Sequence, residues 1–313
     1  MTRGRWLVTG GCGFVGVNLL RTLAREGVTV RVLDNLTTGR REDLAGVDAE
    51  LVVGDVRDPA ATTTALDGVD VVVHLAAHTR VLESIEDPVT SFEVNARGTL
   101  NLLEAVRRRE RPIRFILAST GGAILGDAPP PVHEDMPARP LSPYGASKLA
   151  CEGYCSAYAG SYGLSTVALR FSNVYGPYSC QKGSVVAAFL KRIQAGKPLV
   201  IYGDGSQTRD FLYVGDLCQA ILAAAPREAR GVFHIAAGLE TEIGRLAELV
   251  LRLTGTQLPV EHLPARAGEV HRNSARIDRA RAELGFAPAT LLEDGLAATW
   301  CWFQQAASGR GTV

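Results

Sequence analysis

Short apolar runs alternate with helical patterns through the first half of the chain. Helical periodicity lies between the runs, as at residues 18–23 and 99–106. The runs have little polar alternation, which is typical of parallel strands covered on both faces. The pattern predicts an α/β fold with a doubly wound parallel sheet, whose first strands are residues 6–8, 28–33, 51–53, 69–75 and 113–117.

A glycine-rich turn follows the first predicted strand and opens into a helical pattern. It contains Gly10, Gly13 and Gly16, with Phe14 and Val15 between the last two. In such a turn, bare backbone N–H groups and the positive end of the helix approach a pyrophosphate. The turn therefore predicts a dinucleotide site that includes Gly10, Gly13, Phe14 and Val15.

Asp34 ends the second predicted strand, where a carboxylate accepts hydrogen bonds from the adenosine ribose and repels a 2′-phosphate. This predicts NAD rather than NADP, with Asn35 also among the residues that bind the cofactor. Arg40 and Arg41 follow closely and are interpreted as a solvated loop.

Residues after the third and fourth strands are also expected to line the cofactor site, because ligands bind at the carboxyl ends of strands in open α/β sheets. They are Asp55, Val56, Leu75, Ala76 and Ala77. Asp55 has two interpretations, a contact with the adenine amino group or a cap for the next turn.

The length of 313 residues allows one large domain and a smaller lobe. We expect an NAD-binding domain at residues 1–171, with about 211–240 returning to it. A substrate lobe would comprise residues 172–210 and 241–313. A proline-rich loop at residues 128–131 and a less regular pattern after residue 171 favour this division.

Charge and cysteine content narrow the classes of partner. The chain has 33 Lys and Arg against 33 Asp and Glu, which favours neither nucleic acid nor an anionic membrane. Its six cysteines lack the spacing of a zinc site or a disulfide framework, so no metal is expected. No leader and no apolar stretch of membrane-spanning length is evident, and we predict a cytoplasmic protein.

Tyr144 and Lys148 form the candidate catalytic pair. Their spacing of four places both side chains on one helix face, where an ammonium lowers the pKa of a phenol toward that of a general base. Lys148 is also placed to hold the nicotinamide ribose. Ser119 and Thr120 end the preceding predicted strand and supply a candidate hydroxyl.

Together these motifs resemble the extended short-chain dehydrogenase/reductase family, in its nucleotide-sugar epimerase and dehydratase branch. The resemblance includes Asn95 and the segments 170–177, 202–211 and 266–269, and is strongest to UDP-glucose or UDP-glucuronate 4-epimerases. It implies NAD as cofactor, with Asn95 among its contacts. It also implies that Asn173, Arg209 and Arg266 hold the sugar nucleotide near its phosphates, and that Glu269 holds the nucleoside ribose.

The resemblance implies a mechanism in which Thr120, or Ser119, hydrogen-bonds the sugar 4-hydroxyl while Tyr144 removes its proton. The C4 hydride passes to NAD and leaves a 4-keto sugar. In a 4,6-dehydratase of this branch, an Asp-Glu pair directly follows the threonine that corresponds to Thr120. A UDP-glucuronate decarboxylase carries a glutamate in the same loop. Gly121 and Gly122 stand there instead, which favours a 4-epimerase. The alternatives are a UDP-glucuronate decarboxylase, a nucleotide-sugar 4,6-dehydratase, a one-way 4-keto reductase and a non-catalytic NAD-binding regulatory protein.

The sugar and the nucleotide stay open. UDP is favoured over dTDP, and glucose, glucuronate or an N-acetylhexosamine are all candidates, with Arg80 near C6 and Asn273 near the 2-substituent. The resemblance also implies a homodimer through helices at residues 96–109 and 144–162. Its candidate apolar positions are Leu100, Leu103 and Leu149.

Overall fold

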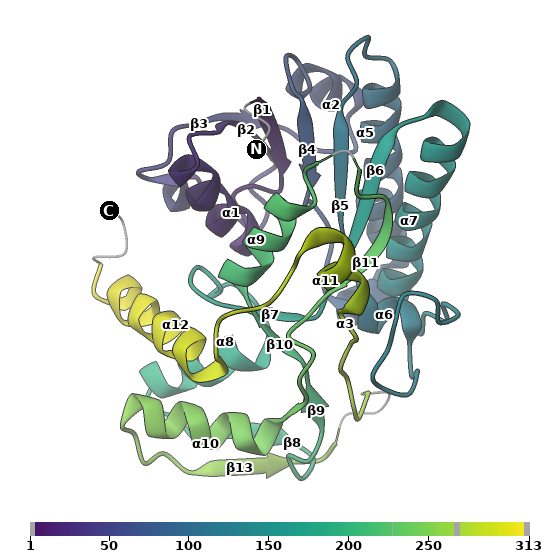
Figure 1. Cartoon of the computed structure of the whole chain (residues 1–313). Coiled ribbons are helices and arrows are strands. Elements are labelled where there is room, and N and C mark those ends of the chain that lie inside the picture. The colour runs from purple at the N-terminus through teal and green to yellow at the C-terminus, as the bar shows by residue number, and fades with distance from the viewer. Residues whose placement is uncertain (1–3, 227, 266–269, 310–313) are drawn as a thin grey trace.

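A seven-stranded parallel sheet forms the centre of the protein (Figure 1). The structure, a computed structural model, describes residues 4–226, 228–265 and 270–309. The strands lie in the order β11-β6-β5-β4-β1-β2-β3. Their bounds are β1 (Arg5–Thr9), β2 (Thr29–Asp34), β3 (Ala49–Val53), β4 (Val71–His74), β5 (Arg114–Thr120), β6 (Ser165–Phe171) and β11 (Gly231–Ile235).

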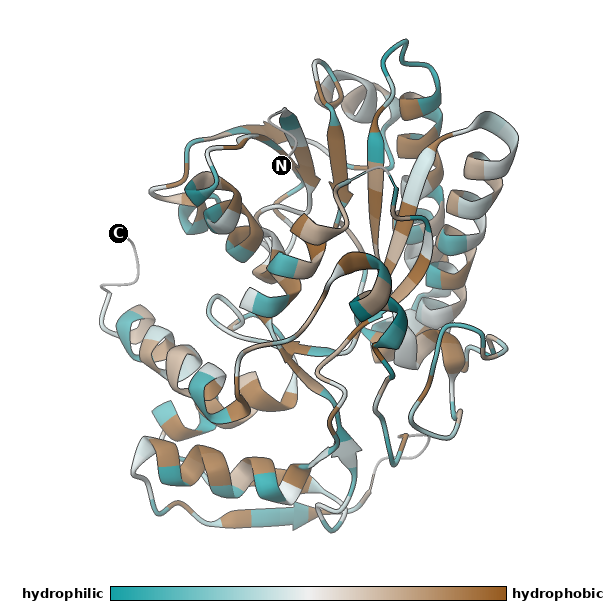
Figure 2. Ribbon diagram, in the orientation of Figure 1, coloured by the Kyte–Doolittle hydropathy of each residue, from teal (hydrophilic) through white to brown (hydrophobic). Residues whose placement is uncertain are grey.

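Helices cover both faces of this sheet. Alternate residues of each strand face opposite sides, so Val8 and Ile116 pack with one set of helices and Leu7 and Phe115 with the other. In Figure 2 the strands are accordingly brown along most of their length, whereas the helices carry mixed colours. One set is α1 (Phe14–Arg25) and α9 (Val214–Ala223), and the other is α2 (Pro59–Ala65), α5 (Gly98–Arg107) and α7 (Pro143–Tyr162). The predicted doubly wound α/β fold is confirmed.

A smaller lobe lies below the sheet in Figure 1. Its own hydrophobic cluster centres on Phe189, Leu246 and Phe303, one from each of three helices. These helices are α8 (Val185–Gln194), α10 (Ile243–Thr254) and α12 (Leu292–Ala307). Its strands pair as β8 (Leu199–Tyr202) with β13 (Val260–Leu263), and β9 (Thr208–Arg209) with β12 (Thr241–Glu242).

Short elements connect the two parts. Strands β7 (Asn173–Tyr175) and β10 (Phe211–Tyr213) pair with each other beneath the main sheet. Helix α11 (Asp278–Leu284) packs on β11, and the nearby Ala275 and Ile277 belong to the cluster of the sheet rather than to that of the lobe. The domain boundaries stay a prediction. The other short elements are α3 (Val81–Glu86), α4 (Pro88–Phe92), α6 (Gly121–Leu125) and single turns at Arg41–Leu44 and Glu93–Arg97.

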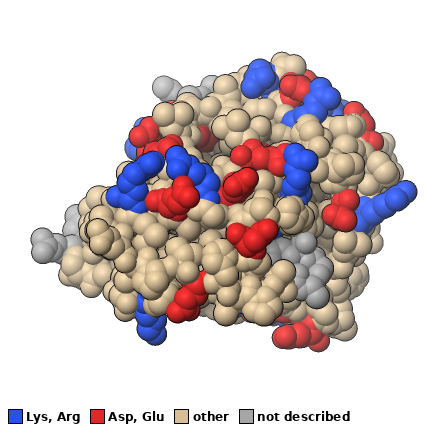
Figure 3. All heavy atoms as spheres, turned by 90° about the horizontal axis from the view of Figure 1, so that it is seen from below, with Lys and Arg blue, Asp and Glu red and all other residues tan. Residues whose placement is uncertain are grey.

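The surface carries both signs of charge. On the face that Figure 3 shows, basic and acidic side chains lie interspersed, in keeping with equal numbers of each in the chain. Within the described ranges, none of the helices combines the length and apolar character that a membrane span requires.

Candidate active site

A cavity of about 800 Å³ opens at the carboxyl ends of the central strands. Strand β1 lies between β2 and β4, so the connections from β1 and from β3 run toward opposite edges of the sheet. Open α/β sheets bind ligands at the point where these two directions diverge. On the dinucleotide side the structure brings together Gly10, Gly13, Phe14, Val15, Asp34, Asn35, Asp55, Val56, Leu75, Ala76 and Ala77. On the opposite side it brings together Ser119, Thr120, Tyr144, Lys148, Asn173 and Arg209.

The turn after β1 leaves bare backbone facing the cavity. Gly10 has φ +69°, and a Cβ there would lie 2.7 Å from the backbone nitrogen of Ala76. Gly13 is the N-cap residue of α1, so the positive end of a 12-residue helix faces the cavity. Backbone N–H groups at a helix N-terminus suit a pyrophosphate, so these residues fit NAD.

Asp34 is buried at the end of β2 and braces the glycine-rich turn. Its Oδ2 accepts a hydrogen bond of 2.9 Å from the backbone N–H of Cys12, and its Oδ1 accepts one of 2.8 Å from that of Leu36. A carboxylate oxygen accepts more than one hydrogen bond, so Asp34 retains capacity for ribose hydroxyls.

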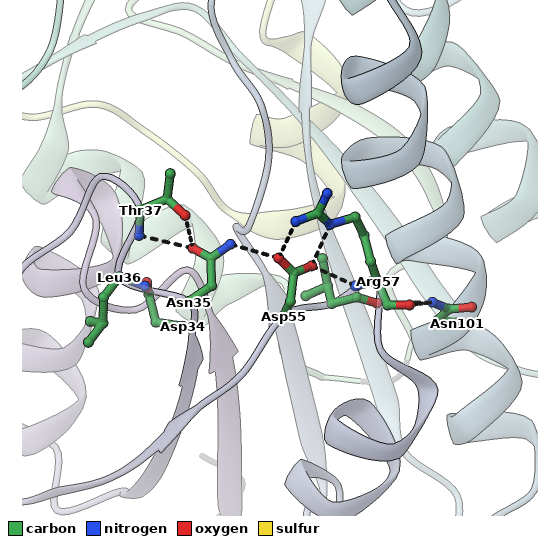
Figure 4. A network of polar contacts seen from close by, with 8 residues as sticks. Asp34, Asn35, Leu36, Thr37, Asp55, Arg57 and Asn101 are labelled. Atoms are coloured by element: carbon green, nitrogen blue, oxygen red, sulfur yellow. Dashed lines mark hydrogen bonds and ion pairs between the residues drawn. The ribbon is translucent and has the colours of Figure 1, made fainter.

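A polar network extends from Asn35 across the ends of β2 and β3 (Figure 4). The Asp55 carboxylate accepts 2.9 and 2.8 Å hydrogen bonds from the Arg57 guanidinium and another of 2.8 Å from the Asn35 amide. The bonds from Arg57 hold the pKa of Asp55 well below its usual range. Arg40 pairs with Asp43 at 3.1 Å. Both arginines are thus paired with carboxylates of the chain itself, which agrees with NAD rather than NADP.

Asn95 does not line the cavity and lies behind its wall. The side chain is fully buried. Its Oδ1 accepts from the His78 backbone N–H at 2.8 Å, and its Nδ2 donates to the Ser147 Oγ at 2.9 Å. Asn95 therefore ties the loop after β4 to helix α7, an indirect role rather than the direct cofactor contact that the sequence predicted.

Thr120, Tyr144 and Lys148 meet where β5 faces the start of α7. Ser142 is the N-cap residue of α7, and its Oγ accepts a 3.1 Å hydrogen bond from the Gly145 N–H. Tyr144, in the first turn, lines the same cavity as Thr120. Lys148, one turn later, is buried and donates to the Ala118 carbonyl at 2.9 Å.

The electrostatics of this group differ from the sequence prediction. Burial raises the pKa of Tyr144, and the Thr120 hydroxyl acts against that rise. Burial also lowers the pKa of Lys148. The expected lowering of the Tyr144 pKa by Lys148 is therefore not the dominant effect, because both groups share a site that disfavours charge.

Comparison with known proteins identifies this arrangement. Residues 6–236 match the model of the NAD dependent epimerase/dehydratase family. The chain belongs to this family. Within it, the chain is 36% identical over 310 residues to the UDP-glucose 4-epimerase of Mycolicibacterium smegmatis, covering 96% of this chain and 98% of that protein. It is also 35% identical over 314 residues to a dTDP-glucose 4,6-dehydratase of Streptomyces niveus, covering 96% and 93% respectively.

A solved relative has nearly the same fold. The UDP-glucose 4-epimerase of Thermus thermophilus, solved in complex with NAD, superposes with a TM-score of 0.90 at 37% identity, covering 96% of this chain and 99% of that one. Membership of the epimerase/dehydratase family and the dependence on NAD, both predicted from the sequence, are confirmed.

Several family-derived positions lie on the lobe side of the cavity. Asn173 begins β7, and Arg209 ends β9 with its Nη1 donating to the Thr208 carbonyl at 2.8 Å. Arg266 and Glu269, predicted to hold the diphosphate and the ribose, lie outside the described residues.

Sequence reasoning missed the loop before α8. Lys182 lines the cavity, its Nζ donates to the Val174 carbonyl at 2.9 Å, and the ammonium lies 5.2 Å from the centre of the Phe14 ring. Burial lowers the Lys182 pKa to about 8. Its place directly after the 170–177 motif, beside a glycine and a serine, was the available signal.

Proposed function

We infer that the chain is an NAD-dependent UDP-sugar 4-epimerase. One observation carries the choice of reaction: a hydroxyl, a phenol and an ammonium meet at the end of β5 without a carboxylate in the adjoining wall. Among the described residues, the carboxylates that line the cavity are Asp34, Asp43 and Asp55, all at or after the ends of β2 and β3. An epimerase needs no further acid or base at the sugar, whereas a 4,6-dehydratase must expel a hydroxyl from C6.

The space beside the two glycines after Thr120 would not accommodate an acidic pair. A Cβ on Gly121 would lie 2.6 Å from the His234 ring, and one on Gly122 would lie 2.9 Å from the Asn273 amide. Real Cβ atoms do not approach other heavy atoms below 3.0 Å, so an acidic pair would displace both neighbours. His234 and Asn273 fill the space beside the two glycines.

Thr120 is the hydroxyl that we assign to catalysis. Its hydroxyl acts on the Tyr144 phenol by opposing the rise in its pKa, whereas the Ser119 Oγ donates its proton to Glu152 at 2.6 Å. Tyr144 takes the proton of the sugar 4-hydroxyl and returns it after the 4-keto sugar has turned its other face. The hydroxyl of Thr120 holds the sugar oxygen in place through both steps.

A bound NAD would supply the acceptor for the C4 hydride and the source of its return. Gly10, Gly13 and Asp34 would hold its pyrophosphate and adenosine ribose, and Lys148 its nicotinamide ribose.

A neutral hexose is the substrate that we propose, attached to UDP. Arg80, the candidate partner of a C6 carboxylate, already pairs with Glu83 through a 2.6 Å contact. The Ser119 Oγ, having donated to Glu152, can only accept from a ligand, so it favours a hydroxyl over a carboxylate. Both features favour UDP-glucose and UDP-galactose over the uronates.

A homodimer is a further part of the proposal. Of the predicted interface positions, Leu103 is fully buried in the core. The exposed apolar side chains nearby belong instead to α3 and α4, which pack on α7: Leu82, Ile85, Val89 and Phe92. Exposed apolar side chains on two adjoining helices favour an interface, and light scattering after size-exclusion chromatography tests it. The cytoplasmic location stays a prediction.

Proton NMR tests the reaction. Purified protein is incubated with UDP-glucose and, separately, with UDP-glucuronate, and the anomeric and H4 signals are followed. UDP-galactose should accumulate to equilibrium without added NADH. A pentose product would indicate decarboxylation, and stoichiometric consumption of NADH in a parallel sample that contains it would indicate a reductase. Absence of turnover in a panel that includes dTDP- and N-acetylated sugars would refute the epimerase.

A further inference from the structure

A buried polar row crosses three strands directly behind the candidate catalytic group. Ser119 on β5 is the register partner of Arg170 on β6, which in turn is the partner of His234 on β11. All three side chains are buried. Glu152, from the overlying helix α7, closes the row from above the sheet.

Glu152 and Arg170 form a bidentate ion pair. The Nε of Arg170 donates to Oε1 at 3.0 Å and its Nη2 donates to Oε2 at 2.8 Å, while both side chains are 6% exposed. The same Oε1 accepts the Ser119 proton at 2.6 Å. Burying such a pair costs desolvation that its attraction barely offsets, so stability is a weak explanation for its presence.

The pair adjoins the residues proposed to transfer protons. Glu152 lies one helical turn after Lys148, and the Lys148 ammonium donates to the carbonyl of Ala118, directly before Ser119. The Glu152 charge acts against the burial that lowers the Lys148 pKa. Arg170 balances Glu152, so the row adds no net charge beside the site.

The imidazoles and thiols that face this region are neutral, and at the far end of the row the Glu134 carboxylate accepts a 2.7 Å hydrogen bond from the backbone N–H of His234. His74 on β4 and His234 on β11 are buried, which lowers the pKa of each to about 3. The thiols of Cys151 and Cys155 on α7 are also buried, and burial raises the pKa of both. Among the described groups that face Lys148, Glu152 is therefore the one that carries negative charge at neutral pH.

We propose that Glu152 and Arg170 are positioning residues for the epimerase site: the ion pair fixes the Ser119 end of β5 and keeps the buried surroundings of Lys148 and Tyr144 electrically balanced. This inference rests on the proposed 4-epimerase activity. Neither residue touches the substrate; the pair acts through Ser119, Lys148 and Tyr144.

Opposite charge changes test the proposal. Glu152→Gln leaves the Arg170 cation unbalanced, which favours the phenolate of Tyr144 and disfavours the ammonium of Lys148. Both limbs of the pH profile of kcat should then move to lower pH, by about one unit. Arg170→Gln should move both limbs to higher pH by a similar amount. We expect kcat to fall by roughly 10- to 100-fold in each, with KM changed less than about threefold.

A control separates this effect from the general cost of removing a buried arginine that is paired with a carboxylate. Arg31 on β2 is also buried and pairs at 2.9 Å with Glu50, whose side chain is 54% exposed, at the far side of the sheet. Arg31→Gln should lower the melting temperature and leave the pH profile of kcat unchanged. Identical pH profiles in wild type, Glu152→Gln and Arg170→Gln would overturn the proposal.

Conservative variants decide the matter if the charge changes prevent folding. Arg170→Lys keeps the charge and loses the bidentate geometry, and Glu152→Asp shortens the reach to Ser119. A fall in kcat of about tenfold at unchanged KM supports positioning, whereas wild-type kcat in both refutes it. An inactive wild type would instead refute the epimerase, and NAD titration shows separately whether each variant still binds the cofactor.

Discussion

The two ends of the cavity handle charge in opposite ways. At the adenosine end, Asp55 pairs with Arg57, whose side chain is 47% exposed. At the catalytic end, Glu152 pairs with Arg170, and both are 6% exposed. Exposed ion pairs contribute about 0–1 kcal/mol, whereas breaking a buried pair costs about 3–5 kcal/mol.

This difference in exposure distinguishes the end of the cavity proposed to bind adenosine from the end proposed to carry out the reaction. Exposed pairs can rearrange around an adenosine, because water replaces any partner that moves away. At the buried end water cannot replace a lost partner, since each charge there depends on a fixed neighbour. Perturbations should therefore have large effects near Tyr144 and small effects near Asp55.

Removal of the Tyr144 hydroxyl should produce the largest effect. Tyr144→Phe eliminates the proton acceptor for the sugar 4-hydroxyl and should lower kcat by about 10²- to 10⁴-fold. NAD affinity should stay within about threefold, because the phenyl ring still fills the same wall. Turnover by NMR and NAD titration on the same preparation check this. Substantial residual activity would assign the base elsewhere.

Acid should destabilise the catalytic end next most strongly. Burial lowers the pKa of His74 and of His234 from the ordinary 6.5, which applies to the unfolded chain, to about 3 in the fold. Their stabilising contribution is therefore complete above about pH 6.5 and is lost as pH falls toward 3. Between pH 7 and pH 5 the unfolding free energy should drop by a few kcal/mol.

Urea unfolding at both pH values measures this loss. In His234→Asn, which cannot titrate, about half of the pH dependence should disappear. An unchanged pH dependence in this variant would show that the imidazole of His234 is not the group responsible.

A methyl group at Gly121 should have an intermediate effect. In Gly121→Ala the new Cβ would lie 2.6 Å from the His234 ring, so the ring or the turn after Thr120 must shift. We expect a loss of about 1–3 kcal/mol in unfolding free energy and a lower kcat.

Gly153 on α7 is the matched control. A Cβ there meets no atom within 4 Å, and alanine favours a helix over glycine. Gly153→Ala should therefore stabilise the protein by about 0.5–1 kcal/mol and leave kcat unchanged. Equal effects at both positions would contradict the crowding at Gly121.

Much of the fold and part of the site follow from local sequence patterns. Apolar runs located the first strands, and the Gly10–Asp34 spacing located the dinucleotide side, because both signals lie within one strand–turn–helix unit. The spacing of Tyr144 and Lys148 likewise gave a shared helix face. These signals depend on residues that are close in the sequence, which is why the sequence alone predicts them.

Long-range contacts could not be predicted in this way. Asn95 was expected at the cofactor, but its partners are His78 and Ser147. The direction of the Tyr144 pKa also reversed, because burial depends on how distant segments enclose the phenol. The occupation of the Gly121 space by His234, more than 100 residues away, has no local signature.

The smallest effect is expected at Asp55, where it also decides between two roles. Asp55→Asn removes the ion pair with Arg57 and should change the unfolding free energy by less than about 1 kcal/mol at pH 7. Because Arg57 lowers the Asp55 pKa below its ordinary 3.8, this contribution is present above about pH 4 and fades as pH falls further. NAD titration then distinguishes the roles. If Asp55 only braces the turn, Asp55→Asn and Arg57→Ala should weaken NAD equally and by less than about threefold. If Asp55 accepts from the adenine amino group, Asp55→Asn alone should weaken NAD about tenfold, since Arg57→Ala leaves the carboxylate in place.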